Sequence, residues 1–171
     1  MWITGLPGSG KSTIAAVLKA ELAERGVDVA VLESDVLRKV FAPVSANDRP
    51  YEAAGREAFY RQMIFVGELL VEHGVPVIFD ATANRRIYRD GARREVARFI
   101  EVYVDTPLET CISRDPKGIY RSAAAGEAKN VPGLQDPYEP PESPEVVVHG
   151  ANKQQDARAI VQKLIEKGYV R

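Results

Sequence analysis

Hydrophobic residues alternate along the chain between two patterns. Short runs rich in β-branched and aromatic residues occur at 1–4, 27–32, 75–79 and 99–104, with a weaker run at 146–148. Apolar residues recur at helical spacing over 11–25, 51–73, 86–97, 107–114 and 154–167. The first pattern predicts buried strands and the second predicts amphipathic helices. Two glycines, Gly26 and Gly74, stand where C-terminal helix caps are expected.

Strands that alternate with helices favour a parallel sheet, because each parallel connection needs a crossover. We therefore expect an α/β fold, a three-layer parallel sheet with helices on both faces. Ligands in such folds bind at the carboxyl ends of the strands. The residues directly after each predicted strand are thus the ones to inspect for chemistry.

Residues 5–12 read Gly-Leu-Pro-Gly-Ser-Gly-Lys-Ser, a complete phosphate-binding loop pattern between the first strand and the first helix. Glycines allow backbone N–H groups to converge on phosphate oxygens. Lys11 supplies a charge for the β- and γ-phosphates, and Ser12 supplies a hydroxyl for Mg²⁺. A chance glycine-rich turn is the alternative, but the strand–loop–helix order favours nucleotide binding. We expect a P-loop kinase that uses ATP and Mg²⁺, with nucleotide contacts from Gly5, Pro7, Gly8, Ser9, Gly10, Lys11, Ser12 and Thr13.

Acids follow three of the predicted strands. Glu33 and Asp35 come after the second strand, Asp80 after the third and Asp105 after the fourth. A kinase needs a carboxylate that holds Mg²⁺ or accepts the proton of the attacking hydroxyl. Asp35 and Asp80 are the candidates, and the choice between them as the acid beside Mg²⁺ stays open. For Asp105 we favour a role as N-cap of the helix at 107–114.

Helical and strand periodicity is lost between residues 115 and 144. In a compact domain spanning 1–171, such a stretch predicts a functional lid. Cations at Arg114, Lys117, Arg121 and Lys129 can neutralise charge on a transferring phosphoryl group, whereas solvated surface charge is the alternative. We expect Arg114 to contact the nucleotide and Lys117 to take part in catalysis.

Composition narrows the choice of partners. With a net charge of −1 over 171 residues, the chain lacks the basic field of a nucleic-acid or membrane surface. We expect a small-molecule acceptor, and homodimer formation is left open. The single cysteine, Cys111, excludes an internal disulfide and is expected to be a buried structural residue. The start of the chain lacks a secretory leader pattern, and a cytoplasmic location is expected.

Five segments together resemble the adenylyl-sulfate kinase family over nearly the whole chain. They are the loop at 5–12, the group Glu33, Asp35 and Arg38, residues 45–49, residues 114–120 (Arg-Asp-Pro-Lys-Gly-Ile-Tyr) and residues 136–141 (Asp-Pro-Tyr-Glu-Pro-Pro). The resemblance implies transfer of the γ-phosphoryl group of ATP to the ribose 3′-hydroxyl of adenylyl sulfate. It also implies that Asp35 lies beside that hydroxyl and Mg²⁺, that Arg38 and Arg49 hold the anionic group of the acceptor, and that Lys117 belongs to the lid.

The chain departs from the family pattern in the expected acceptor pocket. Val44 and Val131 stand where the family has phenylalanines that sandwich the acceptor adenine, which removes roughly 1–3 kcal/mol of stacking per ring. Thr82 can keep the hydroxyl of a family serine, and Asp80 adds a charge that the family lacks. One further acceptor-binding cation is expected at Arg85 or Arg89, within an otherwise solvated arginine-rich helix.

Three hypotheses on function follow. The first is adenylyl-sulfate kinase activity itself. The second is phosphorylation of another small anionic acceptor, such as a pyrimidine nucleotide conjugate, which the two valines favour. The third is a non-catalytic nucleotide-binding module, against which the retained loop, acids and lid all count.

Overall fold

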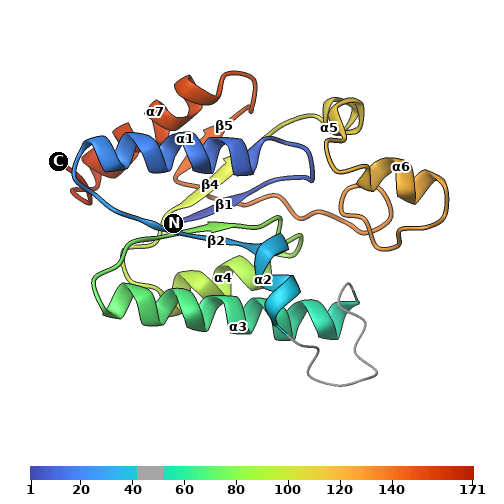
Figure 1. Ribbon diagram of the computed structural model, residues 1–171, viewed down its shortest axis with the longest axis horizontal. Helices are drawn as coiled ribbons and strands as arrows, with labels where there is room; N and C mark the ends of the chain where they lie inside the picture. The colour runs from blue at the N-terminus through green and yellow to red at the C-terminus, as the bar shows by residue number, and fades with distance from the viewer. Residues whose placement is uncertain (42–51) are drawn as a thin grey trace.

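The computed structural model describes residues 1–41 and 52–171, and five parallel strands in this part of the chain form one sheet (Figure 1). The strands are β1 (Trp2–Thr4), β2 (Ala30–Glu33), β3 (Val77–Asp80), β4 (Glu101–Val104) and β5 (Val146–Val148). Their order across the sheet is β2-β3-β1-β4-β5. Because β1 lies between β3 and β4, the loop that follows it leaves from the middle of the sheet. The predicted parallel α/β fold is confirmed.

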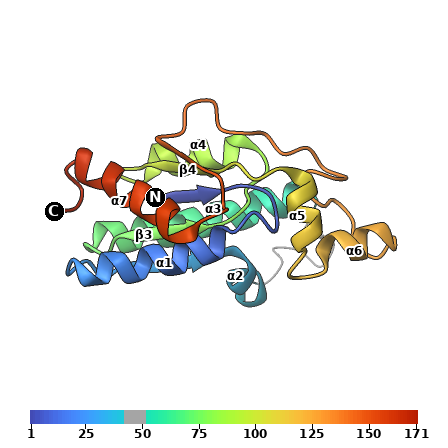
Figure 2. The same ribbon diagram turned by 90° about the horizontal axis from the view of Figure 1, so that it is seen from above.

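Helices cover both faces of the sheet. They are α1 (Lys11–Glu24), α2 (Ser34–Val40), α3 (Ala53–Glu72), α4 (Arg86–Glu95), α5 (Leu108–Arg114), α6 (Ile119–Ala124) and α7 (Lys153–Glu166). In Figure 1, α1 and α7 lie on one face of the sheet, and α3 and α4 lie on the other. Figure 2 shows α5 and α6 beyond one end of the sheet, which leaves them free to border a ligand site.

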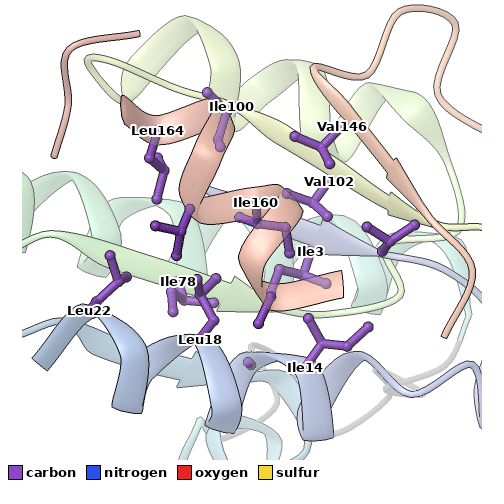
Figure 3. Packing of buried hydrophobic residues seen from close by; sticks show 14 of the residues in the cluster. Ile3, Ile14, Leu18, Leu22, Ile78, Ile100, Val102, Val146, Ile160 and Leu164 are labelled. Atoms are coloured by element: carbon purple, nitrogen blue, oxygen red, sulfur yellow. The ribbon is translucent and has the colours of Figure 1, made fainter. Parts of the chain in front are cut away.

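The face under α1 and α7 is packed with aliphatic side chains (Figure 3). On α1, Ile14, Leu18 and Leu22 are spaced by four residues, so they lie on one side of the helix and all face the sheet. The opposite face is aromatic, where Trp2 stacks on Phe79 with ring centroids 4.9 Å apart. Both layers pack against β1 and so fix the start of the phosphate loop.

Two helices differ from the sequence prediction. Residues 33–38 were expected only as a strand tip, but Ser34–Val40 forms α2 directly after β2. Ile119–Ala124 forms α6 inside the stretch predicted to be irregular. Both helices are too short for apolar spacing to identify them, and none of the α2 residues is buried. The predicted caps are confirmed, since Gly26 and Gly74 follow α1 and α3 with φ of 74° and 79°.

In the part of the chain that the structure describes, no helix combines the length and the apolar character needed to cross a bilayer.

Candidate active site

The phosphate loop has a backbone that depends on its glycines. Gly8 and Gly10 have φ of 77° and 106°, in a region that other residues rarely adopt. A Cβ atom on Gly8 would also lie 2.9 Å from the carbonyl oxygen of Cys111. Gly10 is the N-cap of α1, so the loop leads directly into a helix N-terminus. This is the arrangement that attracts anions.

Contacts from residues later in the chain, from the end of β4 to α6, hold the phosphate loop in place. The carbonyl of Ser9 accepts hydrogen bonds from Thr106 Oγ1 at 3.0 Å and from Arg114 Nη1 at 3.3 Å. The hydroxyl of Tyr120 donates to the carbonyl of Pro7 at 2.9 Å. Arg114, predicted to contact the nucleotide, therefore lies against the loop.

Lys11 is buried beneath the loop. Its Nζ donates to the carbonyl oxygens of Gly5 and Leu6 at 3.0 and 2.9 Å. Burial lowers the pKa of Lys11 to about 8, and the carboxylate of Asp80 is the strongest of the charges that oppose this shift. Asp80 ends β3 and is only 5% exposed. The structure thus places a buried amine and a buried carboxylate near each other at the carboxyl edge of the sheet.

A cavity of about 970 Å³ extends from the loop across this edge. It is bordered by α2, the start of α3, the end of β3 and two stretches of the predicted lid, 114–119 and 127–132. The described side chains that line it include seven cations, namely Lys11, Arg38, Arg56, Arg114, Lys117, Lys129 and Lys153, and six acids, namely Glu33, Asp35, Glu52, Asp80, Asp115 and Glu127. Cations near the phosphate loop suit phosphate groups, and the acids suit a metal ion or a hydroxyl that loses its proton.

Asp35 and Lys117 meet across the cavity. Asp35 lies in the first turn of α2, and Lys117 lies between α5 and α6. The Lys117 Nζ donates to Asp35 Oδ2, and this hydrogen bond raises the pKa of Lys117. Both side chains are more than half exposed, so the pair contributes little to stability. Two of the residues predicted to be catalytic are therefore together in the structure.

The described acceptor candidates line the same cavity. The guanidinium of Arg38 lies 3.7 Å from the ring centroid of Phe59, a cation–π contact that fixes its direction. Thr82 follows β3, and its carbonyl accepts from Thr4 Oγ1 at 2.6 Å. Val131 belongs to a small buried cluster with Cys111, Tyr120 and Ala123, and it contributes to the cavity wall.

Three predictions concern residues that the structure does not describe. Val44, Arg49 and the family-like segment 45–49 lie outside the described residues. Their roles stay predictions.

The predicted N-cap at Asp105 is wrong. Pro107 occupies the N-cap position of α5, and no side chain caps this helix. The Asp105 carboxylate instead accepts from the Tyr103 hydroxyl at 3.0 Å. Because Asp105 precedes the N-cap by two residues, its side chain is too early in the chain to reach the first turn. Cys111 is fully buried, as predicted.

Neither arginine proposed as an extra acceptor cation lines the cavity. Arg89 is buried and donates to Glu101 Oε1 at 2.6 Å, to the carbonyl of Glu139 at 2.6 Å and to the carbonyl of Ala83. Its guanidinium is therefore used to hold the backbone after β3. Of the remaining lid cations, Lys129 lines the cavity and Arg121 does not.

Sequence reasoning missed two cations in the cavity. Arg56 is 5% exposed and shares the buried face of α3 with Phe59, Tyr60 and Met63. The sequence did offer a signal, because Arg56 is a charged residue at a helical position that falls on the apolar face of α3. Lys153 begins α7 shortly after β5, so inspection of the residues after the fifth strand would have found it.

The oxygen donors of the cavity fit a magnesium ion that arrives with a nucleotide. Ser12, Asp35 and Asp80 all line it. Within residues 1–41 and 52–171, no group of three or more His, Cys, Asp or Glu side chains is placed to hold a metal ion by itself. Mg²⁺ commonly takes one or two carboxylates and completes its coordination with phosphate oxygens and water. The donor set matches that mode.

Comparison with known proteins agrees with this geometry. Residues 1–149 match the family model described as adenylylsulphate kinase. The chain is 40% identical to an adenylyl-sulfate kinase of Synechococcus sp. (strain JA-2-3B'a(2-13)) over 99% of this chain and 96% of that protein. It is 38% identical to a probable adenylyl-sulfate kinase of Pyrococcus abyssi over 99% of this chain and 97% of that protein.

A solved structure is also similar. The APS (adenylyl sulfate) kinase CysC of Mycobacterium tuberculosis, in complex with AMPPNP and APS, has a TM-score of 0.86 and 34% identity to this chain. The match covers 96% of this chain and 95% of that one. The similarity therefore extends over the sheet, the phosphate loop and the lid region together.

Proposed function

This chain belongs to the adenylyl-sulfate kinase family, and we propose that it transfers the γ-phosphoryl group of ATP to the 3′-hydroxyl of adenylyl sulfate. The observation that carries the proposal is one cavity that joins the phosphate loop to Asp35 and Lys117. A donor and an acceptor nucleotide bound in the same cavity can bring the reacting oxygen and phosphorus atoms together.

The donor binds at the loop in this proposal. Backbone N–H groups of residues 8–11 and the Lys11 ammonium hold the β- and γ-phosphates, and the N-terminus of α1 adds favourable charge. Ser12 and Asp80 hold Mg²⁺, which when bound neutralises charge on the phosphates. We assign Asp80 to this role because it is buried close to Lys11, whereas Asp35 lies further out, beside Lys117.

The acceptor binds on the α2 and α3 side. Asp35 orients the 3′-hydroxyl and receives its proton as the oxygen attacks phosphorus. Arg38 holds an anionic group of the acceptor, and Thr82 and Val131 border its base. Lys117 stabilises the charge that develops on the transferring phosphoryl group.

Closure of the lid excludes water. Two stretches of the predicted lid, residues 115–119 and 127–132, border the cavity. Water that reached the γ-phosphate would compete with the acceptor hydroxyl. We therefore expect ATP hydrolysis to stay far below phosphoryl transfer when the acceptor is present.

Variants of the two central residues test the proposal. Lys11→Ala and Asp35→Ala should abolish phosphorylation of adenylyl sulfate while circular dichroism shows an intact fold. Asp28→Ala, at an exposed acid outside the cavity, serves as the matched control and should keep wild-type turnover. Near-normal turnover in either cavity variant would remove that residue from catalysis. The cytoplasmic location stays a prediction, and homodimer formation stays open.

A further inference from the structure

The loop after β3 is held in a strained conformation by a second segment of the chain. Ala83 has a φ of 40°, which is costly for a residue with a Cβ atom. Its N–H donates to the Tyr60 hydroxyl at 3.0 Å, and its carbonyl accepts from Arg89. Next to it, the carbonyl of Asn84 accepts from the Glu139 N–H at 2.7 Å. Thr82 is therefore presented to the cavity by a loop that is bonded on several sides.

The segment at 136–140 belongs to this rigid support. The Arg86 N–H donates to Glu139 Oε2 at 2.8 Å, and the Tyr138 hydroxyl lies 3.0 Å from Thr4 Oγ1. Asn84 Nδ2 donates to Asp136 Oδ2 and to the carbonyl of Pro137 at 3.0 and 3.1 Å. The lid was predicted to extend to residue 144. These bonds limit its movable part to residues before 136.

Arg56 connects the rigid support to the movable part. From α3, its Nη1 donates to Asn84 Oδ1 at 3.0 Å, on the fixed loop. Its Nη2 donates to the carbonyl of Asn130 at 2.6 Å and lies 3.6 Å from Asp136 Oδ2. Asn130 directly precedes Val131, which forms a wall of the cavity. The Val131 carbonyl also accepts backbone hydrogen bonds from residues 134–136, so this wall has anchors of its own. To these anchors Arg56 adds a buried link between the wall and the loop that carries Thr82.

Arg56 also lines the cavity itself, together with Tyr60, Thr82 and Val131. Hydrogen bonds from a guanidinium to a carbonyl and an amide oxygen are directional, and they are stronger in a buried site than in water. The bonded geometry of Arg56 is thus suited to setting the width of the acceptor pocket.

We propose that Arg56 is a positioning residue for the acceptor, which holds the Asn130–Val131 wall against the fixed loop after β3 and so sets acceptor affinity. The inference rests on the proposed function, because it assigns this side of the cavity to the acceptor. A loose wall enlarges the acceptor pocket and leaves the phosphate loop unchanged. Loss of the Arg56 side chain should therefore weaken binding of the acceptor and leave ATP binding intact.

Steady-state kinetics with separate KM values for ATP and adenylyl sulfate test this. Arg56→Gln should raise KM for adenylyl sulfate at least about tenfold, the order expected for losing charge-assisted hydrogen bonds. KM for ATP should stay within about twofold, because the Arg56 hydrogen bonds described above go to Asn84 and Asn130, on the acceptor side of the cavity. Arg56→Lys keeps the charge and should recover part of the loss. Arg61→Gln is the control, since Arg61 lies on the same helix with a side chain 79% exposed and pairs with Glu57 at the surface.

Hydrogen exchange of the backbone amides at 128–136 gives a readout that does not need turnover. Exchange there should be faster in Arg56→Gln than in the wild type and unchanged in Arg61→Gln. Equal KM values for adenylyl sulfate in wild type and Arg56→Gln would overturn the inference and leave the proposed function standing. A wild type without adenylyl-sulfate turnover would overturn the proposed function. Unchanged hydrogen exchange at 128–136 in Arg56→Gln would show that Arg56 does not hold the Asn130–Val131 wall, and would overturn the inference independently of turnover. If Arg56→Gln does not fold, the same measurements on Arg56→Lys decide.

Discussion

Replacing Lys11 with methionine is expected to stabilise the fold while it abolishes turnover. Burial lowers the pKa of Lys11 from its usual 10.5 to about 8. A shift of this size corresponds to about 3 kcal/mol of unfolding free energy that is lost whenever the buried amine carries its proton. Methionine has a similar length and no charge, so it avoids this cost. The substitution also removes the hydrogen bonds to the carbonyls of Gly5 and Leu6 and leaves the buried Asp80 without this cation, so about 3 kcal/mol is an upper bound on the gain. The lysine is retained for phosphate binding at the expense of stability.

The sign of the pH dependence follows from the lowered pKa. The unfolded chain keeps the Lys11 proton up to about pH 10.5, whereas the folded chain releases it near pH 8. The wild type is therefore destabilised in full below pH 8 and regains stability as the pH rises from 8 to 10.5. Lys11→Met does not share this rise. The difference in unfolding free energy between Lys11→Met and the wild type should be largest at pH 7 and should decrease as the pH approaches 10.5.

Urea unfolding of the two proteins at several pH values measures this difference. Lys11→Met should exceed the wild type by up to about 3 kcal/mol at pH 7. The control is Lys19→Met, at an exposed lysine on the same helix, which should stay within about 0.5 kcal/mol of the wild type. A less stable Lys11→Met at pH 7, or a difference that does not change with pH, would refute the reasoning.

Three further variants test other parts of the molecule. Arg89→Met leaves the Glu101 carboxylate buried without its closest cation and should cost about 3–5 kcal/mol in urea unfolding. The exposed Arg94→Met is its control, and a loss below about 1 kcal/mol would contradict the buried pairing. Gly67→Ala places a methyl group against the ring of Phe79 and should cost about 1–3 kcal/mol in the same assay. Gly91→Ala has its nearest contact at 3.4 Å, from Ile64, and should be tolerated; equal losses in the two alanine variants would count against the packing of α3 on β3. Asp80→Asn should lower kcat about 100-fold or more and raise the Mg²⁺ concentration required for half-maximal turnover. A drop of less than about tenfold would remove Asp80 from the site of the metal.

Local patterns in the sequence were sufficient for the sheet and the phosphate loop. The strands are short apolar runs, and Ile14, Leu18 and Leu22 of α1 are spaced by four, so a single stretch of sequence identifies each element. The loop at 5–12 is likewise one continuous motif. The candidate residues around it follow from the rule that ligands bind at the carboxyl ends of parallel strands. Asp35, Asp80 and Thr82 were found in this way because Asp80 ends β3 and the other two stand two residues after the end of a strand.

The acceptor side was less predictable because its contacts join distant segments. Arg56 reaches Asn84 and Asn130, which are 28 and 74 residues away along the chain. No local pattern links these positions, so Arg56 was read only as part of an amphipathic helix. Arg89 was misjudged for the same reason, since its partners lie on β4 and at 139. An arginine-rich helix gives no sign of which guanidinium turns inward.

The most direct test is a product assay with purified protein, ATP, Mg²⁺ and adenylyl sulfate, run beside a panel of cytidine and uridine nucleotide conjugates. Adenylyl sulfate should be phosphorylated on its 3′-hydroxyl with one ADP formed per phosphorylated product, and the pyrimidine conjugates should react poorly. Turnover with a pyrimidine conjugate but not with adenylyl sulfate, or ADP release without a phosphorylated acceptor, would contradict the proposed function.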